Sequence, residues 1–168
     1  MTPNELAAII DGEGGPAPTS AEIEAFEALI GARLPDDYRA FLALTRGGRL
    51  RKPVVFSLAG EEIGTERVGC VAGLCADEDC SLEERHRTAS DCDIPEGLLS
   101  IMTDGGGNDI ALVLRPDRCG EVFFLDHEVS GGEGRPTLED AEGEDWVYAI
   151  RFASSFSEMV AGFRSAPF

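Results

Sequence analysis

Three stretches near the N-terminus place hydrophobic side chains three and four positions apart, which is the spacing of one helical face. They cover residues 2–10, 19–30 and 34–45. Thr2 and Thr19 each precede a glutamate by three residues, and this capping-box pattern begins a helix. Pro35 suits the first turn of the third helix, and Gly31 suits a helix end. The pattern therefore predicts three N-terminal helices.

From Pro53 onward the apolar residues form short runs bounded by glycine and proline, which is typical of strands. We expect strands at 54–58, 68–75, 110–114, 122–125 and 146–152, and a turn at 94–99 that leads into another extended segment. Two more capping boxes, at Ser81 and Ser155, predict a short helix among the strands and a C-terminal helix with an apolar stripe. Residues 129–145 are acidic and contain glycines, so we expect a loop there.

The predicted elements are segregated along the chain, with helices first, then strands, then a closing helix. This order favours an α+β fold in which a largely antiparallel sheet has the N-terminal helices and the C-terminal helix packed on it. A chain of 168 residues suits one folding unit, so we expect residues 1–168 to form a single domain.

The charge is strongly acidic, with 32 acidic residues against 14 basic ones and a net charge of −18. Such a field repels nucleic acid and anionic membranes, and it speeds the encounter with a basic partner. It is equally compatible with a role in solubility alone. No targeting segment and no long apolar run are visible, so we expect a cytoplasmic protein that binds neither nucleic acid nor membrane.

The five cysteines predict neither a disulfide framework nor a metal site. They are Cys70, Cys75, Cys80, Cys92 and Cys119. Their number is odd, and at least four residues separate any two, whereas zinc ligands come in pairs at closer spacing. Cys70 and Cys75 lie in an apolar stretch and are expected to be small core residues.

Two polar motifs could carry chemistry, and each has a simpler interpretation. Asp126-His127-Glu128 contains an acid–base pair, but neighbours on a strand face opposite sides, so the motif is better explained as a strand end. The glycine-rich segment Asp104–Asp109 lacks the lysine and spacing of a phosphate loop, and carboxylates flank it. A sharp turn that needs positive φ explains it better. We therefore expect no catalytic residue and no cofactor.

Two acidic stretches are candidates for binding a partner, because they lie in predicted loops and at a helix start. The residues are Asp77, Glu78, Asp79, Glu83 and Glu84 in the first stretch, and Glu139, Asp140, Glu142, Glu144 and Asp145 in the second. Together they could mimic the charge of nucleic acid and block a basic site, or they could simply be solvated. Trp146 could anchor such an interface or be a half-buried start of the last strand.

The only basic cluster follows the third predicted helix and comprises Arg46, Arg49, Arg51 and Lys52. Arg46 is expected to interact with the negative end of that helix. The other three could bind an anion or an acidic partner, and the sequence leaves this open.

Five blocks in a fixed order resemble one known family. The blocks are Leu34–Leu42 followed by Gly47-Gly48, Ile94–Ile101, Asp104–Asp109, Gly120–Glu128 and Ala153–Phe156. Each block is weak alone, but five in register across most of the chain are specific. They resemble the SUKH superfamily, which includes a yeast cell-wall assembly regulator. Arg46, where an asparagine is usual, and Phe124 and Leu125, where other aromatic residues are frequent, depart from the pattern and blur the subgroup.

The resemblance implies a bacterial immunity protein that binds and neutralises a cognate polymorphic or contact-dependent toxin, such as a nuclease, without catalysis of its own. The alternative that it implies is a cytoplasmic scaffold or regulatory protein-binding module. The expected partner is the cognate toxin protein, and the chain itself is expected to be a monomer or a weak dimer.

Overall fold

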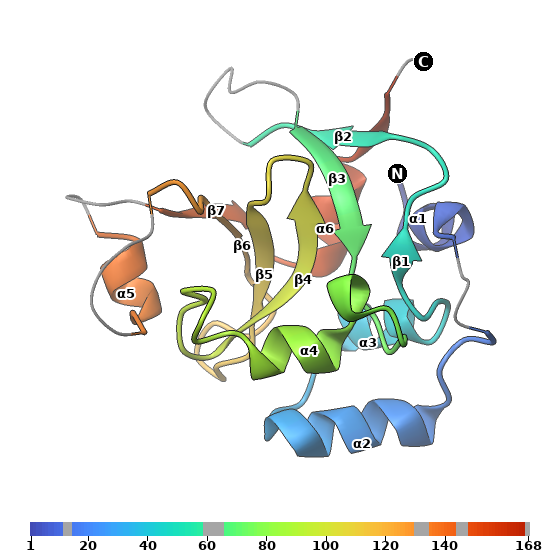
Figure 1. Cartoon of the computed structure of the whole chain (residues 1–168), viewed down its shortest axis with the longest axis horizontal. Coiled ribbons are helices and arrows are strands. Elements are labelled where there is room, and N and C mark those ends of the chain that lie inside the picture. Colours follow the sequence, from blue (N-terminus) through green and yellow to red (C-terminus); the bar gives the residue numbers. More distant parts are fainter. Residues whose placement is uncertain (12–14, 59–65, 130–134, 144–147, 167–168) are drawn as a thin grey trace.

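The computed structural model describes residues 1–11, 15–58, 66–129, 135–143 and 148–166 (Figure 1). The helices are α1 (Pro3–Ile9), α2 (Ser20–Ile30), α3 (Asp36–Leu42), α4 (Leu82–Arg87), α5 (Leu138–Ala141) and α6 (Phe156–Ala161), and η1 (Glu78–Cys80) is a 3-10 turn. The strands are β1 (Gly48–Arg49), β2 (Val54–Phe56), β3 (Glu66–Val71), β4 (Leu98–Asp104), β5 (Asp109–Val113), β6 (Val122–Leu125), β7 (Ala149–Ala153) and β8 (Arg164–Ser165).

The helix starts follow the capping residues in the sequence. The Thr2 and Thr19 hydroxyls accept hydrogen bonds from backbone amides three residues on, and the glutamates there accept from the threonine amides in return. Gly31 ends α2 with φ +67°, in the left-handed region that favours glycine. Pro35 differs from the prediction, because it is the N-cap of α3 and not part of its first turn.

The strands pair in the order β7-β6-β5-β4-β3-β2-β8, and β1 pairs with β3. Every pair is antiparallel. Helices from both ends of the chain pack on this sheet, which confirms the predicted α+β class. Four elements were missed: β1 and β8 have only two residues each, η1 has three, and α5 lies in the stretch that was expected to be a loop.

Alternate residues of a strand point to opposite sides of the sheet. In this sheet both sets are largely hydrophobic, so each face contributes to a core. The larger core joins one face to α1, α2, α3 and α6, with Ile110 and Leu112 contributed by β5. The smaller core joins the other face to α5, and the intervening β5 residues Ala111 and Val113 belong to it. Both cores therefore depend on the same central strands.

One expectation about the cysteines is corrected. The structure joins Cys70 and Cys80 in a disulfide, with the sulfurs 2.16 Å and the Cα atoms 6.0 Å apart. Cys70 is buried as expected, whereas Cys75 is only partly buried. The pairing was missed because it depends on how η1 folds back onto β3, which cysteine spacing does not reveal.

Helices of the described part of the chain are too short or too polar to cross a lipid bilayer.

Candidate functional site

Two adjacent hollows open on either side of the segment that follows β3. The first has a volume of about 470 Å³ and the second of about 480 Å³, and Cys75 lines both. Each is large enough to receive side chains of another molecule. The segment between them leads into the first acidic stretch of the sequence, which starts at Asp77.

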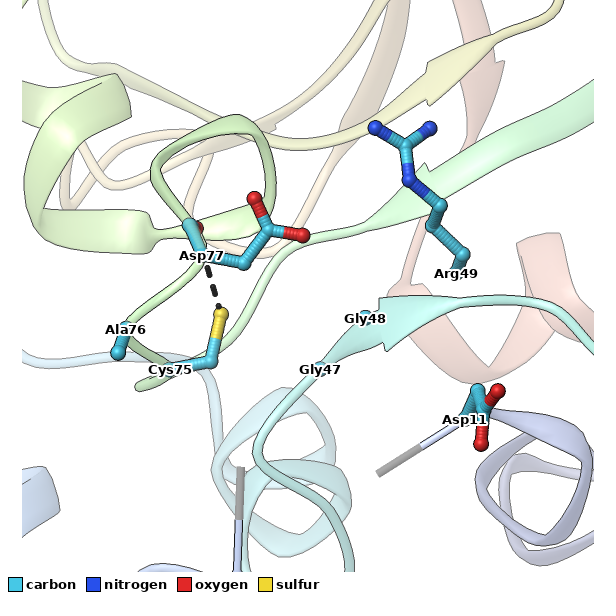
Figure 2. Close-up of a pocket in the computed structure, with 7 residues that line it drawn as sticks. All are labelled: Asp11, Gly47, Gly48, Arg49, Cys75, Ala76 and Asp77. Carbon is cyan, nitrogen blue, oxygen red and sulfur yellow. Dashed lines mark hydrogen bonds between the residues drawn. The ribbon is translucent and has the colours of Figure 1, made fainter. Parts of the chain in front are cut away.

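The first hollow lies between residues 75–77 and the glycine pair that precedes β1. Figure 2 shows Cys75 and Asp77 on one side, Gly47 and Gly48 on the other, and Asp11 at the lower right. Two of the three charged groups that line it are already in ion pairs, and the third, Asp77, accepts only a backbone hydrogen bond. Asp11 pairs with Arg51 at 3.1 Å, and Arg49 pairs with Asp79 at 2.7 Å. The Asp77 carboxylate accepts a hydrogen bond from the Asp79 amide at 3.1 Å.

The second hollow is a groove between α2 and the start of α4, two helices that run along the lower side of the molecule in Figure 1. Helix α2 contributes Glu22, Ala25, Phe26 and Leu29, while Arg46, Leu74, Cys75, Ser81 and Glu83 complete the lining. Its lining is therefore mixed, with apolar side chains from both walls and carboxylates among them. We refer to these residues as the α2–α4 groove.

The segment between the hollows is held by a close approach of two glycines. A Cβ atom on Gly73 would lie 2.0 Å from the Arg46 carbonyl oxygen, and one on Gly47 would lie 2.5 Å from the Gly73 amide nitrogen. Gly47 also has φ +83°. Two backbones can approach this closely only where both residues lack side chains. Gly47, the first glycine of the pair that closes the first sequence block, therefore serves backbone packing.

Gly73 also binds the chain that follows the segment. The Gly73 amide donates to the Cys80 carbonyl at 2.9 Å, and the Leu82 amide donates to the Gly73 carbonyl at 3.0 Å. Together with the Cys70–Cys80 bond, these contacts close the loop that forms one wall of each hollow. A wall closed in this way is ordered before any partner arrives, which lowers the entropic cost of binding.

The sequence suggested that Arg46 interacts with the C-terminal end of α3, but the structure shows other partners. Its guanidinium donates to the Pro16 carbonyl at 2.6 Å, to the Leu74 carbonyl at 2.8 Å and to the Glu22 carboxylate at 2.6 Å. The prediction failed because the partners of Arg46 lie 24 to 30 positions away in the sequence, where local helix geometry gives no indication of them. Arg46 thus joins the two walls of the α2–α4 groove.

The first acidic stretch lies beside both hollows. Asp77 lines the first and Glu83 lines the groove. Asp79 is paired with Arg49, and Glu84 forms a close ion pair with Arg87. The structure therefore places this stretch at a recessed surface, although part of its charge is neutralised.

The second stretch is more fully neutralised where it is described. Glu139 pairs with Arg115 at 2.7 Å, and the Glu142 carboxylate accepts from Arg118 at 3.2 Å. Asp140 accepts from the Thr137 hydroxyl in the capping box of α5, and these hydrogen bonds lower its pKa.

Glu139 and Glu142 tie the α5 region to the β5–β6 connection, and neither they nor Asp140 line a hollow. Glu144, Asp145 and Trp146 lie outside the described residues.

The polar motifs weighed in the sequence are occupied by local contacts. The Asp104 carboxylate accepts from the Gly106 and Asn108 amides at 2.8 Å, so the glycine-rich segment is a turn organised by its own aspartate. His127 Nδ1 lies 2.7 Å from the Asn108 side-chain oxygen, and Asp126 accepts from the Glu128 amide. Both motifs therefore fit the structural roles expected for them.

A buried polar cluster that the sequence did not reveal lies under α4. Arg85 donates to the Ser100 hydroxyl at 2.8 Å and to the Asp109 carboxylate at 3.3 Å, and Ser100 makes a short hydrogen bond to Asp109. Burial raises the pKa of Asp109, while Ser100 and Arg85 oppose that shift. The cluster anchors α4 to the sheet and so fixes one wall of the groove.

Two observations bear on the chemistry of the described residues. Burial raises the pKa of the Cys75 thiol, which disfavours the nucleophilic thiolate form. Across the described ranges, no group of three or more histidine, cysteine or acidic side chains could hold a metal ion.

Comparison with known proteins gives one family. No curated protein matches the chain. The sequence profile of the SMI1 / KNR4 family (SUKH-1) matches residues 17–162, which include both hollows apart from Asp11.

Proposed function

Because the chain belongs to the SMI1 / KNR4 family (SUKH-1), we propose that it is a non-catalytic immunity protein that binds and neutralises a cognate bacterial toxin. The toxin would be a polymorphic or contact-dependent one, such as a nuclease. Inhibition would be stoichiometric, with the immunity protein covering the site at which the toxin acts. No cofactor or metal would take part.

The observation that carries this proposal is the recessed, acid-bordered surface formed by the two hollows. Asp77 and Glu83 border it, and the chain carries a net charge of −18. Enzymes that act on nucleic acid bear basic surfaces, so this field would speed their encounter with the chain. The closed loop between the hollows supports a preorganised interface of this kind.

The first acidic stretch supports the proposal better than the second does. Glu139 and Glu142 are engaged by Arg115 and Arg118, so a partner would have to displace those arginines. Asp77 and Glu83 have no ion pair among the described residues. We therefore propose that the toxin contacts the first stretch. We further propose that the chain acts in the cytoplasm as a monomer or weak dimer.

Co-expression tests the function. A toxin domain encoded beside the chain's gene would be induced in a bacterial host with and without the chain, and growth would be measured. Rescue of growth supports immunity. Continued killing, with both proteins present in soluble form, rejects it and leaves the scaffold or regulatory role as the better explanation.

A further inference from the structure

The α2–α4 groove exposes apolar surface that the fold does not use. Leu29 lies on its α2 wall with 58% of its surface exposed, and it is the most exposed of the large hydrophobic residues in the described chain. Leu74 on the facing wall is only partly buried, and Phe26 lies beneath. An apolar strip between two walls gains free energy when another apolar side chain covers it.

The two carboxylates beside this strip differ in whether they already form an ion pair. Glu22 is held by Arg46 at 2.6 Å and by the Thr19 amide at 2.8 Å. Glu83 is exposed and forms no ion pair with any residue that the structure describes. A cationic side chain entering the groove would therefore meet Glu83 and would not have to break an existing ion pair.

A second copy of the chain is a poor occupant for this groove. Each copy carries a net charge of −18, so two copies repel one another at the acidic face. A segment that brings both an apolar and a basic side chain satisfies Leu29 and Glu83 together. Such a segment complements the groove in charge as well as in polarity.

We propose that the α2–α4 groove docks a segment of the partner protein that places an apolar side chain against Leu29 and Leu74 and a lysine or arginine at Glu83. This inference rests on the proposed function in taking the toxin as the partner. It adds the position of the contact and the chemistry of the segment that makes it. Arg46, by joining both walls, sets the width of the groove that receives the segment.

A phage-displayed library of random peptides tests the groove without a known toxin. Selection on the wild-type chain should enrich peptides that carry arginine or lysine close to leucine, isoleucine or phenylalanine. Leu29→Arg should weaken the binding of the enriched peptides by about tenfold or more, because it removes the apolar contact and adds a repelling charge. Glu83→Lys should weaken it in the same direction.

Two control variants have matched chemistry elsewhere on the surface. Leu44 is 47% exposed and lines neither hollow, so Leu44→Arg should leave peptide affinity unchanged. Glu96 is exposed, forms no ion pair with any described residue and lines neither hollow, so Glu96→Lys should also leave peptide affinity unchanged. No enrichment, enrichment without basic residues, or equal losses in a variant and its control would overturn the groove proposal.

The outcomes separate this proposal from the proposed function. Groove-binding peptides together with failed growth rescue would keep the groove and reject immunity. Growth rescue that survives Leu29→Arg, with no peptide selected, would keep immunity and reject the groove. Self-association of the chain that Leu29→Arg abolishes would identify a second copy as the occupant and would also overturn the proposal.

Discussion

The Arg46 guanidinium donates a hydrogen bond to the Glu22 carboxylate at 2.6 Å, and this contact joins the turn before β1 to helix α2. The same guanidinium reaches the carbonyls of Pro16 and Leu74. One side chain therefore ties together three segments that are distant in sequence. Two of them form opposite walls of the α2–α4 groove.

Replacing Arg46 with methionine should loosen α2. The carbonyls of Pro16 and Leu74 would lose a charged donor, which costs about 1–3 kcal/mol of unfolding free energy. Urea denaturation would measure the loss, and amide exchange should rise in α2. Arg33→Met is a suitable control, because its pair with Asp36 is well exposed and should contribute little. Equal effects of the two substitutions would contradict this role of Arg46.

Glu22 should remain ionised far into the acid range. Hydrogen bonds from the Thr19 backbone and then from Arg46 lower its pKa from 4.5 to about 2. A lowered pKa means that the carboxylate stabilises the fold above the unfolded pKa, and that this contribution is lost as the pH falls through about 2.

An NMR titration of the side-chain carboxyl carbon would give the midpoint. Glu22→Gln should flatten the decline of stability with falling pH over the same range. A midpoint near the ordinary value would show that the two contacts do not persist in solution.

Tyr38 should tolerate loss of its hydroxyl. The side chain is fully buried against Phe41 and Phe156, and its hydroxyl oxygen has no hydrogen-bond partner among the described groups. Leaving a buried polar group unsatisfied costs about 1–3 kcal/mol. Tyr38→Phe should therefore unfold at an equal or higher temperature in calorimetry. A clear decrease would mean that the hydroxyl has a partner in solution.

Gly73→Ala should be severely destabilising. Its Cβ would meet the Arg46 carbonyl carbon at 2.3 Å and the Gly47 amide at 2.5 Å, and backbone cannot move aside as a flexible side chain can. We expect a loss of roughly 3 kcal/mol or more, measured by urea unfolding. Gly105→Ala is the control, since its nearest neighbour would be 3.8 Å away. Near-equal stability of the two variants would be inconsistent with this packing.

The sequence predicted those elements that are specified locally. Thr2, Thr19 and Ser155 mark helix starts through hydrogen bonds within four residues, and the structure confirms all three. The run 122–125 became β6 with the same boundaries, because its apolar residues serve both cores. Strand β8 was missed, since two exposed residues that pair with β2 carry no pattern of their own.

The candidate site was predicted less well, because it depends on contacts that are distant in sequence. The acidic residues were visible, but the arginines that neutralise Glu139 and Glu142 lie 24 positions away. Leu29 has the spacing of the apolar helical face predicted for residues 19–30, yet it is exposed in the groove. That residues 1–168 form a single domain stays a prediction, and one cooperative unfolding transition would support it.

A titration of toxin activity with the purified chain tests the central claim most directly. The toxin domain would be held at fixed concentration, well above the dissociation constant of the complex, while increasing amounts of the chain are added. Stoichiometric inhibition predicts a linear fall in toxin activity that ends at an equimolar ratio. Complete inactivation by far less than one equivalent, or full activity at a large excess of the chain, would contradict it.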